Sequence, residues 1–230
     1  MKKLLKMLFT LAVFGLVTAP ATAYPDVDDS HWAAAQIKLL TEQGVIIGYP
    51  DGTFKPDENV TRAEFATMAI KALGQEHTKV VQPVNFTDIN EDHWAYSEIQ
   101  KALYFDLISC DKNGELFRPD DSVSRAESIT VAVNALTTET ISVAKAKEVL
   151  AQKYVDTHTI PEWFIIPAGK AEILEMIVIA PSAQKASLEA ERPATRAEVA
   201  AILFNMMEQA KLNPNAKLAE AMRKKTGEGI

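Results

Sequence analysis

The feature that most constrains this chain is one sequence pattern that occurs three times. The first copy runs from Tyr24-Pro25-Asp26-Val27 through a tryptophan to Thr61-Arg62-Ala63-Glu64. The motif arginine follows the tryptophan by 30, 31 and 33 residues in the three copies, which are Trp32 to Arg62, Trp94 to Arg125 and Trp163 to Arg196. Such even spacing is improbable by chance and predicts three similar structural units.

Each copy predicts two helices joined by a turn-rich loop. Apolar residues with helical spacing follow the first tryptophan at Ile37, Leu40 and Val45, and a second apolar stripe beginning at Phe65 follows the arginine motif. Phe54 and Phe117, which follow the turns, are predicted to fold back as apolar plugs. We therefore predict an all-α, mainly helical fold of three helix-loop-helix repeats. These are repeat 1 (residues 24–77), repeat 2 (86–138) and repeat 3 (154–211), with a connecting helix at residues 139–153.

Repeat 3 departs from the other two repeats in its loop. It retains Tyr154-Val155-Asp156 and the arginine motif, but Ala180-Pro181-Ser182 stands where repeat 1 has Gly48-Tyr49-Pro50-Asp51-Gly52. Pro167 and Gly169 fall within its first apolar stretch, where both residue types disfavour a helix. We expect that helix to be interrupted.

The N-terminus has the layout of a secretory signal peptide. Lysines precede an apolar run from Met7 to Val17, and the small residues Ala21-Thr22-Ala23 follow it, which predicts a signal peptide at residues 1–23 and cleavage before Tyr24. The run is eleven residues long, whereas a helix that spans a bilayer needs about 20. We therefore expect an exported protein with no membrane span after cleavage, located in the cell wall, at the cell surface or in the periplasm.

Composition narrows the partners further. The formal net charge is −7. The charged residues of the signal peptide are all lysines, so cleavage makes the chain more negative. Nucleic acid, which is itself negatively charged, is therefore not an expected partner. Cys110 is the single cysteine, which allows no disulfide within one chain. Residues 212–230 form a C-terminal tail with few large apolar residues, whose far end is expected to be frayed.

The three arginine motifs share a second signal. Each places a hydroxyl residue three positions before a glutamate, which is the pattern of a capping box, in which both side chains bind backbone N–H groups. The pairs are Thr61 and Glu64, Ser124 and Glu127, and Thr195 and Glu198. Capping accounts for the hydroxyl and the carboxylate and leaves the arginine unexplained.

The motif arginine stands in the first helical turn, where the helix dipole disfavours a cation unless an anion lies close. One interpretation is an exposed ion pair with acids just upstream, such as Asp57 and Glu58. The other is a site in which the guanidinium and free N–H groups of the first turn bind a carboxylate or phosphate. Both interpretations treat the arginine as exposed, so alanine in its place is expected to leave stability nearly unchanged.

The other polar and aromatic residues have structural explanations. The three tryptophans are expected to pack in the core or between repeats, with sugar stacking as the alternative. His31 and His93 are expected to form local hydrogen bonds, and Asp111 and Asn113 match a calcium loop only in part. The sequence holds no nucleophile motif and no metal-spaced histidine pair, so we expect no catalytic residue, metal or cofactor.

Taken together, these motifs resemble the surface-layer homology (SLH) module, over most of residues 24–210. The resemblance implies a pseudo-threefold, mainly helical assembly with ligand grooves between neighbouring modules. It also implies cell-wall glycans as ligands, either a secondary wall polymer, often one that bears a pyruvate ketal, or peptidoglycan. The implied anion contacts are Arg62, Arg125 and Arg196, and the implied groove residues are Trp32, Trp94, Gly48, Asp26 and Asp88.

The resemblance implies a non-enzymatic protein anchored non-covalently in the cell envelope. The alternative is a helical scaffold that binds other envelope proteins through its apolar inter-repeat faces. Because repeat 3 lacks the turn, we expect one groove to be inactive and Arg196 to matter less than Arg62 and Arg125.

Overall fold

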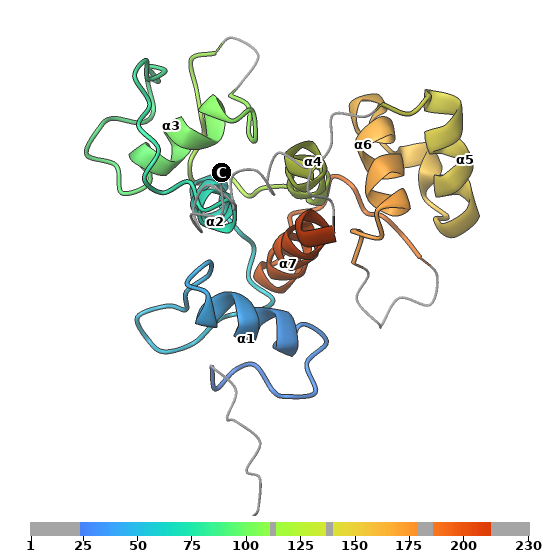
Figure 1. The fold of residues 1–230 in the computed structure, drawn as a ribbon, viewed down its shortest axis with the longest axis horizontal. Helices are drawn as coiled ribbons and strands as arrows, with labels where there is room; N and C mark the ends of the chain where they lie inside the picture. The colour runs from blue at the N-terminus through green and yellow to red at the C-terminus, as the bar shows by residue number, and fades with distance from the viewer. Residues whose placement is uncertain (1–23, 111–113, 137–139, 179–185, 213–230) are drawn as a thin grey trace, which may run out of the picture.

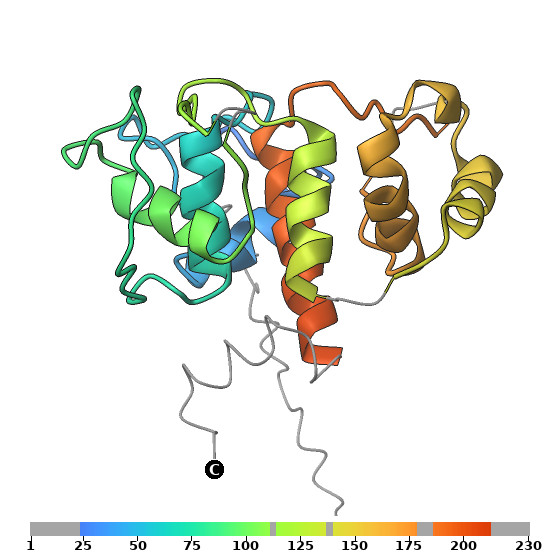
Figure 2. The same ribbon diagram turned by 90° about the horizontal axis from the view of Figure 1, so that it is seen from above.

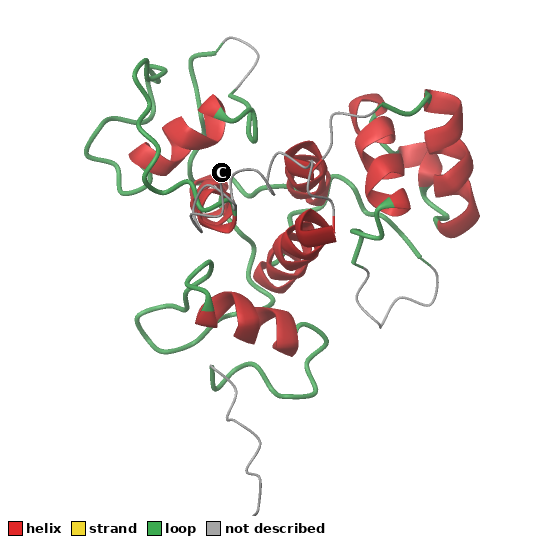
Figure 3. Cartoon of the chain, viewed as in Figure 1, coloured by secondary structure: helices red, strands yellow, loops and turns green. Residues whose placement is uncertain are grey.

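The computed structural model describes residues 24–110, 114–136, 140–178 and 186–212. Within these ranges the chain contains seven α-helices, one short 3-10 turn at Thr157–Thr159 and no β-strand (Figure 3), which confirms the all-α prediction. The helices are α1 (Ala34–Glu42), α2 (Arg62–Ala72), α3 (Tyr96–Tyr104), α4 (Arg125–Leu136), α5 (Val143–Lys153), α6 (Glu162–Ile173) and α7 (Arg196–Leu212).

Helices α2, α4 and α7, each of which begins at a motif arginine, stand together at the centre of the molecule (Figures 1 and 2). Most of their residues are buried, including Phe65, Ile129 and Leu203. Many of the others are alanines, whose small side chains let the helix backbones approach closely at native packing density. Helices α1, α3 and α6 surround this centre as three outer lobes (Figure 1).

Each outer helix packs on a central helix from another repeat. Helix α3 packs on α2, α6 on α4, and α1 on α7, so the outer helix of one repeat covers the central helix of the preceding repeat in a closed cycle. The two helices that pack together therefore come from two successive repeats rather than from one repeat. The core is continuous through all three repeats.

Backbone hydrogen bonds close the same cycle above the central helices. The N–H of Val123 donates to the carbonyl of Val60 at 2.9 Å, that of Val60 to Ala194 at 3.0 Å, and that of Ala194 to Val123 at 2.9 Å. Three residues from distant parts of the chain thus satisfy one another's backbone groups. This triangle marks the pseudo-threefold axis.

The described part of repeat 3 keeps the positive-φ positions of the other two repeats. The outer helices are all followed by a residue with positive φ, which is Gly44, Asp106 or Glu175. A second set, Lys55, Arg118 and Glu189, has positive φ directly after the buried plug residue of each loop. The plugs are Phe54, Phe117 and, in repeat 3, Leu188, and all three are fully buried. Non-glycine residues rarely adopt this conformation, so its recurrence indicates that tertiary contacts impose it.

Helix α6 is continuous from Glu162 to Ile173, so the expected interruption at Pro167 and Gly169 is wrong. The helix packs on α4 on one side and on α5 on the other, and this packing outweighs the lost hydrogen bond of the proline. Gly169 has a specific role there, because a Cβ atom would lie 2.6 Å from the Cβ of Ala146 and 2.7 Å from its Cα. The glycine lets α5 and α6 touch.

Several sequence predictions fall outside the described residues. They are the signal peptide at residues 1–23, the partial calcium loop at 111–113, the altered loop of repeat 3 at 179–185 and the tail from residue 213 onward. Within the described ranges, no helix has the length and apolar character needed to cross a bilayer, and no three His, Cys, Asp or Glu side chains gather as metal ligands.

Candidate functional site

The three capping boxes are present at the starts of the central helices. The Thr61 N–H donates to Glu64 Oε2 at 2.9 Å, and the Glu64 N–H donates to Thr61 Oγ1 at 3.2 Å. The same two bonds join Ser124 with Glu127 and Thr195 with Glu198. These residues fix the start of each central helix and the orientation of its glutamate.

The remaining N–H groups of each first turn are also occupied. The N–H of Arg62 donates to the carbonyl of Asp121 at 2.8 Å, and that of Ala63 to Pro119 at 3.0 Å. Equivalent bonds start α4, to the carbonyls of Arg192 and Ala190, and α7, to those of Glu58 and Pro56. The interpretation in which free N–H groups of the first turn bind an anion is therefore wrong, because carbonyl groups of neighbouring repeats occupy those N–H groups.

The motif arginines are buried, which contradicts their expected exposure. Arg62, Arg125 and Arg196 are 2%, 2% and 3% exposed. Arg62 donates from Nε to the carbonyl of Phe117 at 2.9 Å, from Nη2 to that of Ser109, and from Nη1 to Glu127 Oε1 at 3.0 Å. Its partners all belong to repeat 2. Each arginine thus joins two repeats.

The other two arginines continue the cycle. Arg125 of repeat 2 donates to the carbonyls of Leu188 and Val178 in repeat 3, at 3.0 and 3.2 Å. Arg196 of repeat 3 donates to the carbonyls of Phe54 and Ile47 in repeat 1, both at 2.8 Å. Arg196 therefore binds the loop of repeat 1, and Arg125 binds Val178 and Leu188, which lie on either side of residues 179–185 in repeat 3. This offset removes the reason to expect a minor role for Arg196.

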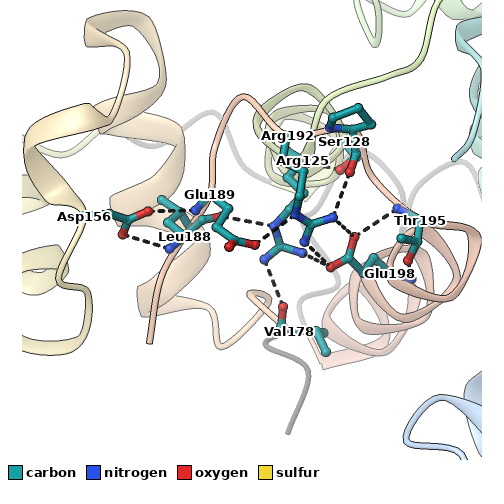
Figure 4. Close-up of polar contacts among 10 residues, drawn as sticks. Arg125, Ser128, Asp156, Val178, Leu188, Glu189, Arg192, Thr195 and Glu198 are labelled. Atoms are coloured by element: carbon teal, nitrogen blue, oxygen red, sulfur yellow. Dashed lines mark hydrogen bonds and ion pairs between the residues drawn. The ribbon is translucent and has the colours of Figure 1, made fainter. Parts of the chain in front are cut away.

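The contact between Arg125 and repeat 3 contains an additional cation. Glu198 accepts a hydrogen bond from Arg125 Nη1 at 2.7 Å and another from Arg192 Nη2 at 2.7 Å, so two guanidinium groups hold one carboxylate (Figure 4). Burial raises the pKa of Glu198, but the two arginines and the Thr195 N–H outweigh this effect and hold the pKa below its ordinary value. Arg192 stands four residues before the motif arginine, where repeats 1 and 2 have Glu58 and Asp121.

Asp26 and Asp88 bind backbone N–H groups of the loops and line neither of the two grooves described below. Asp26 accepts hydrogen bonds from the N–H groups of Phe54 and Lys55, at 2.8 and 2.6 Å, and Asp88 does the same for Phe117 and Arg118. Burial raises the pKa of Asp26, but the backbone N–H groups lower it below its ordinary value. In repeat 3, Asp156 binds the N–H groups of Leu188 and Glu189 in the same way.

The described residues form two grooves between the repeats. The first groove, of about 190 Å³, is lined by Val45, Ile46, Ile47, Gly48, Tyr49, Glu64, Thr67, Met68, Lys71, Trp94 and Arg196. The second groove, of about 330 Å³, is lined by Phe65, Leu107, Ile108, Ser109, Glu127, Thr130, Val131 and Trp163. Each groove takes residues from all three repeats. The two grooves have the same plan: a helix face that carries a glutamate and a threonine, a loop after the outer helix, and a tryptophan.

Two of the three tryptophans, Trp94 and Trp163, are exposed rather than packed in the core or between repeats as expected. Trp94 and Trp163 are 62% and 54% exposed and line the first and second grooves. Trp32 is half-buried against the core and lines neither groove. The tryptophan at the rim of the second groove, Trp163, was missed as a groove residue, although its place in the repeat is the same as that of Trp94.

Gly48 and the histidines have local structural roles. A Cβ atom on Gly48 would lie 2.3 Å from Cε1 of Tyr24 and 2.6 Å from the carbonyl oxygen of Thr53, so this groove residue must be a glycine. His31 and His93 accept hydrogen bonds through Nδ1 from the N–H groups of Ala33 and Ala95, both at 3.2 Å, as the local interpretation predicted.

The comparisons with known proteins agree with this geometry. A model described as the S-layer homology domain matches residues 23–66 and 85–127. The chain carries two SLH modules. Each matched segment ends within the first five residues of a central helix, α2 or α4, and so includes the outer helix, the loop and the arginine motif.

Similar sequences occur in a cell surface glycoprotein, a cellulosome-anchoring protein and an S-layer protein. The chain is 41% identical over 124 residues to cell surface glycoprotein 1 of Acetivibrio thermocellus, a match that covers 50% of this chain and 5% of that protein. It is 42% identical over 116 residues to a cellulosome-anchoring protein of the same organism (49% and 26%), and 29% identical over 203 residues to an S-layer protein of Bacillus thuringiensis subsp. finitimus (86% and 23%). The matches span between 5% and 26% of the length of these relatives. Together with the SLH modules, they support a role at the cell surface.

Proposed function

We propose that this protein is an exported, non-catalytic anchor that binds cell-wall glycan, either a secondary wall polymer or peptidoglycan, in its two inter-repeat grooves. The observation that carries the proposal is the exposure of Trp94 and Trp163 at equivalent positions on the two grooves. Leaving an indole in water forgoes the stabilisation that burial brings. Its recurrence beside a concave surface is typical of a binding site.

The grooves have the chemistry that a sugar requires. A pyranose ring has apolar C–H faces, which stack on an indole, and hydroxyl groups at its edge, which need hydrogen-bond acceptors. In each groove a tryptophan supplies the flat surface, a capping-box glutamate supplies carboxylate oxygens, and a threonine supplies a hydroxyl. The capping boxes and buried arginines hold these groups in place, which reduces the entropy that binding must overcome.

We further propose that repeat 3 acts as a third SLH module. Its support is structural: Asp156, Leu188 and Glu189 repeat the loop contacts of the other two repeats, and Arg196 and Trp163 complete the first and second grooves. On this proposal the three repeats build the binding surface jointly.

The alternative function, a scaffold for other envelope proteins, uses the same apolar grooves with a protein segment as the occupant. Wall sacculi treated with protease separate the two functions, because they retain glycan and lack protein partners. We expect the protein to cosediment with such sacculi. Stripping the secondary polymer from them shows which glycan is bound.

The decisive variants are Trp94→Ala and Trp163→Ala, with Tyr104→Ala as the matched control. Tyr104 is an aromatic residue of the same exposure, 63%, that lines neither groove. Loss of one stacking contact is expected to lower sacculus affinity by about tenfold, in line with the roughly 1–3 kcal/mol lost when an aromatic side chain that stacks on a nucleobase is replaced by alanine. The melting temperature is expected to stay unchanged. Equal affinity for the tryptophan variants and the tyrosine variant contradicts glycan binding in the grooves.

A further inference from the structure

A histidine lies beside the exposed tryptophan of the first groove. His93 accepts a hydrogen bond through Nδ1 from the Ala95 N–H at 3.2 Å, and the centre of its ring lies 5.7 Å from that of the Trp94 indole. Ala95 is fully buried, so its N–H cannot bond to water instead. The histidine therefore fixes the short turn that presents Trp94 to the groove.

This turn needs a side-chain acceptor because Trp94 lies outside its helix. Helix α3 begins two residues after Trp94, and Ala95, the residue before the helix, provides no side-chain cap. Trp163 of the second groove lies within α6, which begins at Glu162 in the place of the histidine. The helical backbone sets the position of Trp163, whereas the position of Trp94 depends on one hydrogen bond to an imidazole.

That hydrogen bond requires a neutral ring. Protonation places a hydrogen on both ring nitrogens, so Nδ1 can no longer accept. Histidine is the side chain whose charge ordinarily changes between about pH 5 and 8. Protonation of His93 leaves the buried Ala95 N–H without its acceptor. It also places a cation at the N-terminal end of α3, where the helix dipole disfavours it, so both effects act against the turn that holds Trp94.

The charged groups around the imidazole do not offset these effects. Those on its own loop and helix are Glu91, Asp92, Glu98 and Lys101, and those that share the first groove with Trp94 are Glu64, Lys71 and Arg196. Glu98 pairs with Lys101 at 3.2 Å, and Arg196 lies 4.0 Å from Glu64. None of the ion pairs among the described residues includes His93, so no paired carboxylate stabilises its charged form.

We infer that His93 is a positioning residue for the first groove, which holds Trp94 in place while the imidazole is neutral and releases it on protonation. The first groove then loses affinity for glycan as the pH falls from about 7.5 to about 5, and the second groove does not. This inference rests on the proposed glycan binding.

The test replaces His93 with asparagine, which keeps an acceptor and does not take up a proton in this pH range. The same loop already contains such a contact, because Asn90 Oδ1 accepts a hydrogen bond from the N–H of Asp92 at 3.1 Å. The matched control is His31→Asn. His31 makes the same 3.2 Å bond beside Trp32, which lines neither groove.

Affinity for protease-treated wall sacculi is measured by cosedimentation at about pH 7.5 and about pH 5, a window above the range in which most carboxylates titrate. Circular dichroism at both pH values shows that each variant is folded. Any change that acid causes in the sacculi themselves acts on all variants alike, so the comparison is between variants.

The wild type is expected to bind about threefold to tenfold more weakly at the lower pH, since the loss cannot exceed the contribution of one stacked ring. His93→Asn is expected to remove this pH dependence, and His31→Asn to keep it. Trp94→Ala is also expected to remove it, because no ring remains to be released. Trp163→Ala is expected to lower the affinity at both pH values and to keep the pH dependence.

The outcomes separate this inference from the proposed function. If the folded wild type binds sacculi at neither pH, glycan binding itself is wrong. If it binds, and His93→Asn retains the pH dependence of the wild type, glycan binding stands and the role of His93 is overturned. The same pH dependence in Trp94→Ala and the wild type also overturns it, because the effect then arises outside the first groove. A wild-type affinity that is equal at the two pH values does so as well.

Discussion

Replacing Arg125 with alanine tests whether the motif arginines hold the repeats together. The side chain is almost completely buried and donates to the carbonyls of Leu188 and Val178 and to Glu198. Alanine leaves the two carbonyls without these donors and removes one of the two cations that pair with Glu198. All three losses fall on the contact between repeats 2 and 3.

The magnitude follows from burial. Removing one partner of a buried ion pair costs about 3–5 kcal/mol, and since Arg192 still pairs with Glu198 we expect about 3 kcal/mol here. For a protein of this length, a loss of that size lowers the melting temperature by about 6–12 °C. The control is Arg118→Ala. Arg118 is a half-exposed arginine paired with Asp121 at 3.4 Å, whose removal is expected to cost about 0–1 kcal/mol.

Calorimetry and urea unfolding of the two variants measure the difference directly. Arg125→Lys is expected to recover only part of the stability, because a lysine cannot reach three acceptors in the planar arrangement of the guanidinium. If Arg125→Ala melts within 2 °C or so of Arg118→Ala, the structural role of the motif arginine is refuted. That result would instead support the expectation from the sequence, that alanine in place of a motif arginine leaves stability nearly unchanged.

Two further predictions concern the same region of the molecule. The pKa of Glu198 lies below its ordinary 4.5, so the stabilising contribution of this carboxylate is fully present above that pH and is lost as the pH falls through the folded-state pKa. Urea midpoints measured between about pH 3 and 7 should therefore decline less steeply with falling pH in Glu198→Gln than in the wild type. An identical slope contradicts the lowered pKa. Gly169→Val places side-chain atoms against Ala146 and should lower the free energy of unfolding by about 1–3 kcal/mol through overpacking. Adding Ala146→Gly should restore only part of this stability, because the Cα of residue 146 also lies too close to a side chain at position 169.

Local sequence signals predicted the local structure of the repeats well. A hydroxyl three residues before a glutamate specifies a capping box through contacts within one turn, and the apolar stripe that begins at Phe65 specifies the buried face of α2. The plugs Phe54 and Phe117 follow turn residues and are buried. None of these features needs information from another repeat.

The contacts between repeats were not predictable in the same way. Helical periodicity shows that α3 has an apolar face and does not show that this face meets α2 of the preceding repeat. The burial of Arg62 depends on the carbonyls of Ser109 and Phe117, which lie 47 and 55 residues away in sequence, so a cation in a first turn resembled an exposed one. Arg192 had a visible signal, since aligning the three repeats places it opposite Glu58 and Asp121.

The cyclic packing of the outer and central helices predicts that repeats 1 and 2 do not fold cooperatively without repeat 3. In a chain that ends at residue 138, α1 has no α7 to pack on, the loop of repeat 1 lacks the guanidinium of Arg196, and the triangle of Val60, Val123 and Ala194 is open. The fragment retains both matched SLH segments, so a repeat that folds independently would still melt cooperatively. We expect instead that calorimetry shows no cooperative transition for the fragment. A sharp transition near that of the full chain contradicts the interlocked fold, because it requires α1 and α4 to find their packing without repeat 3.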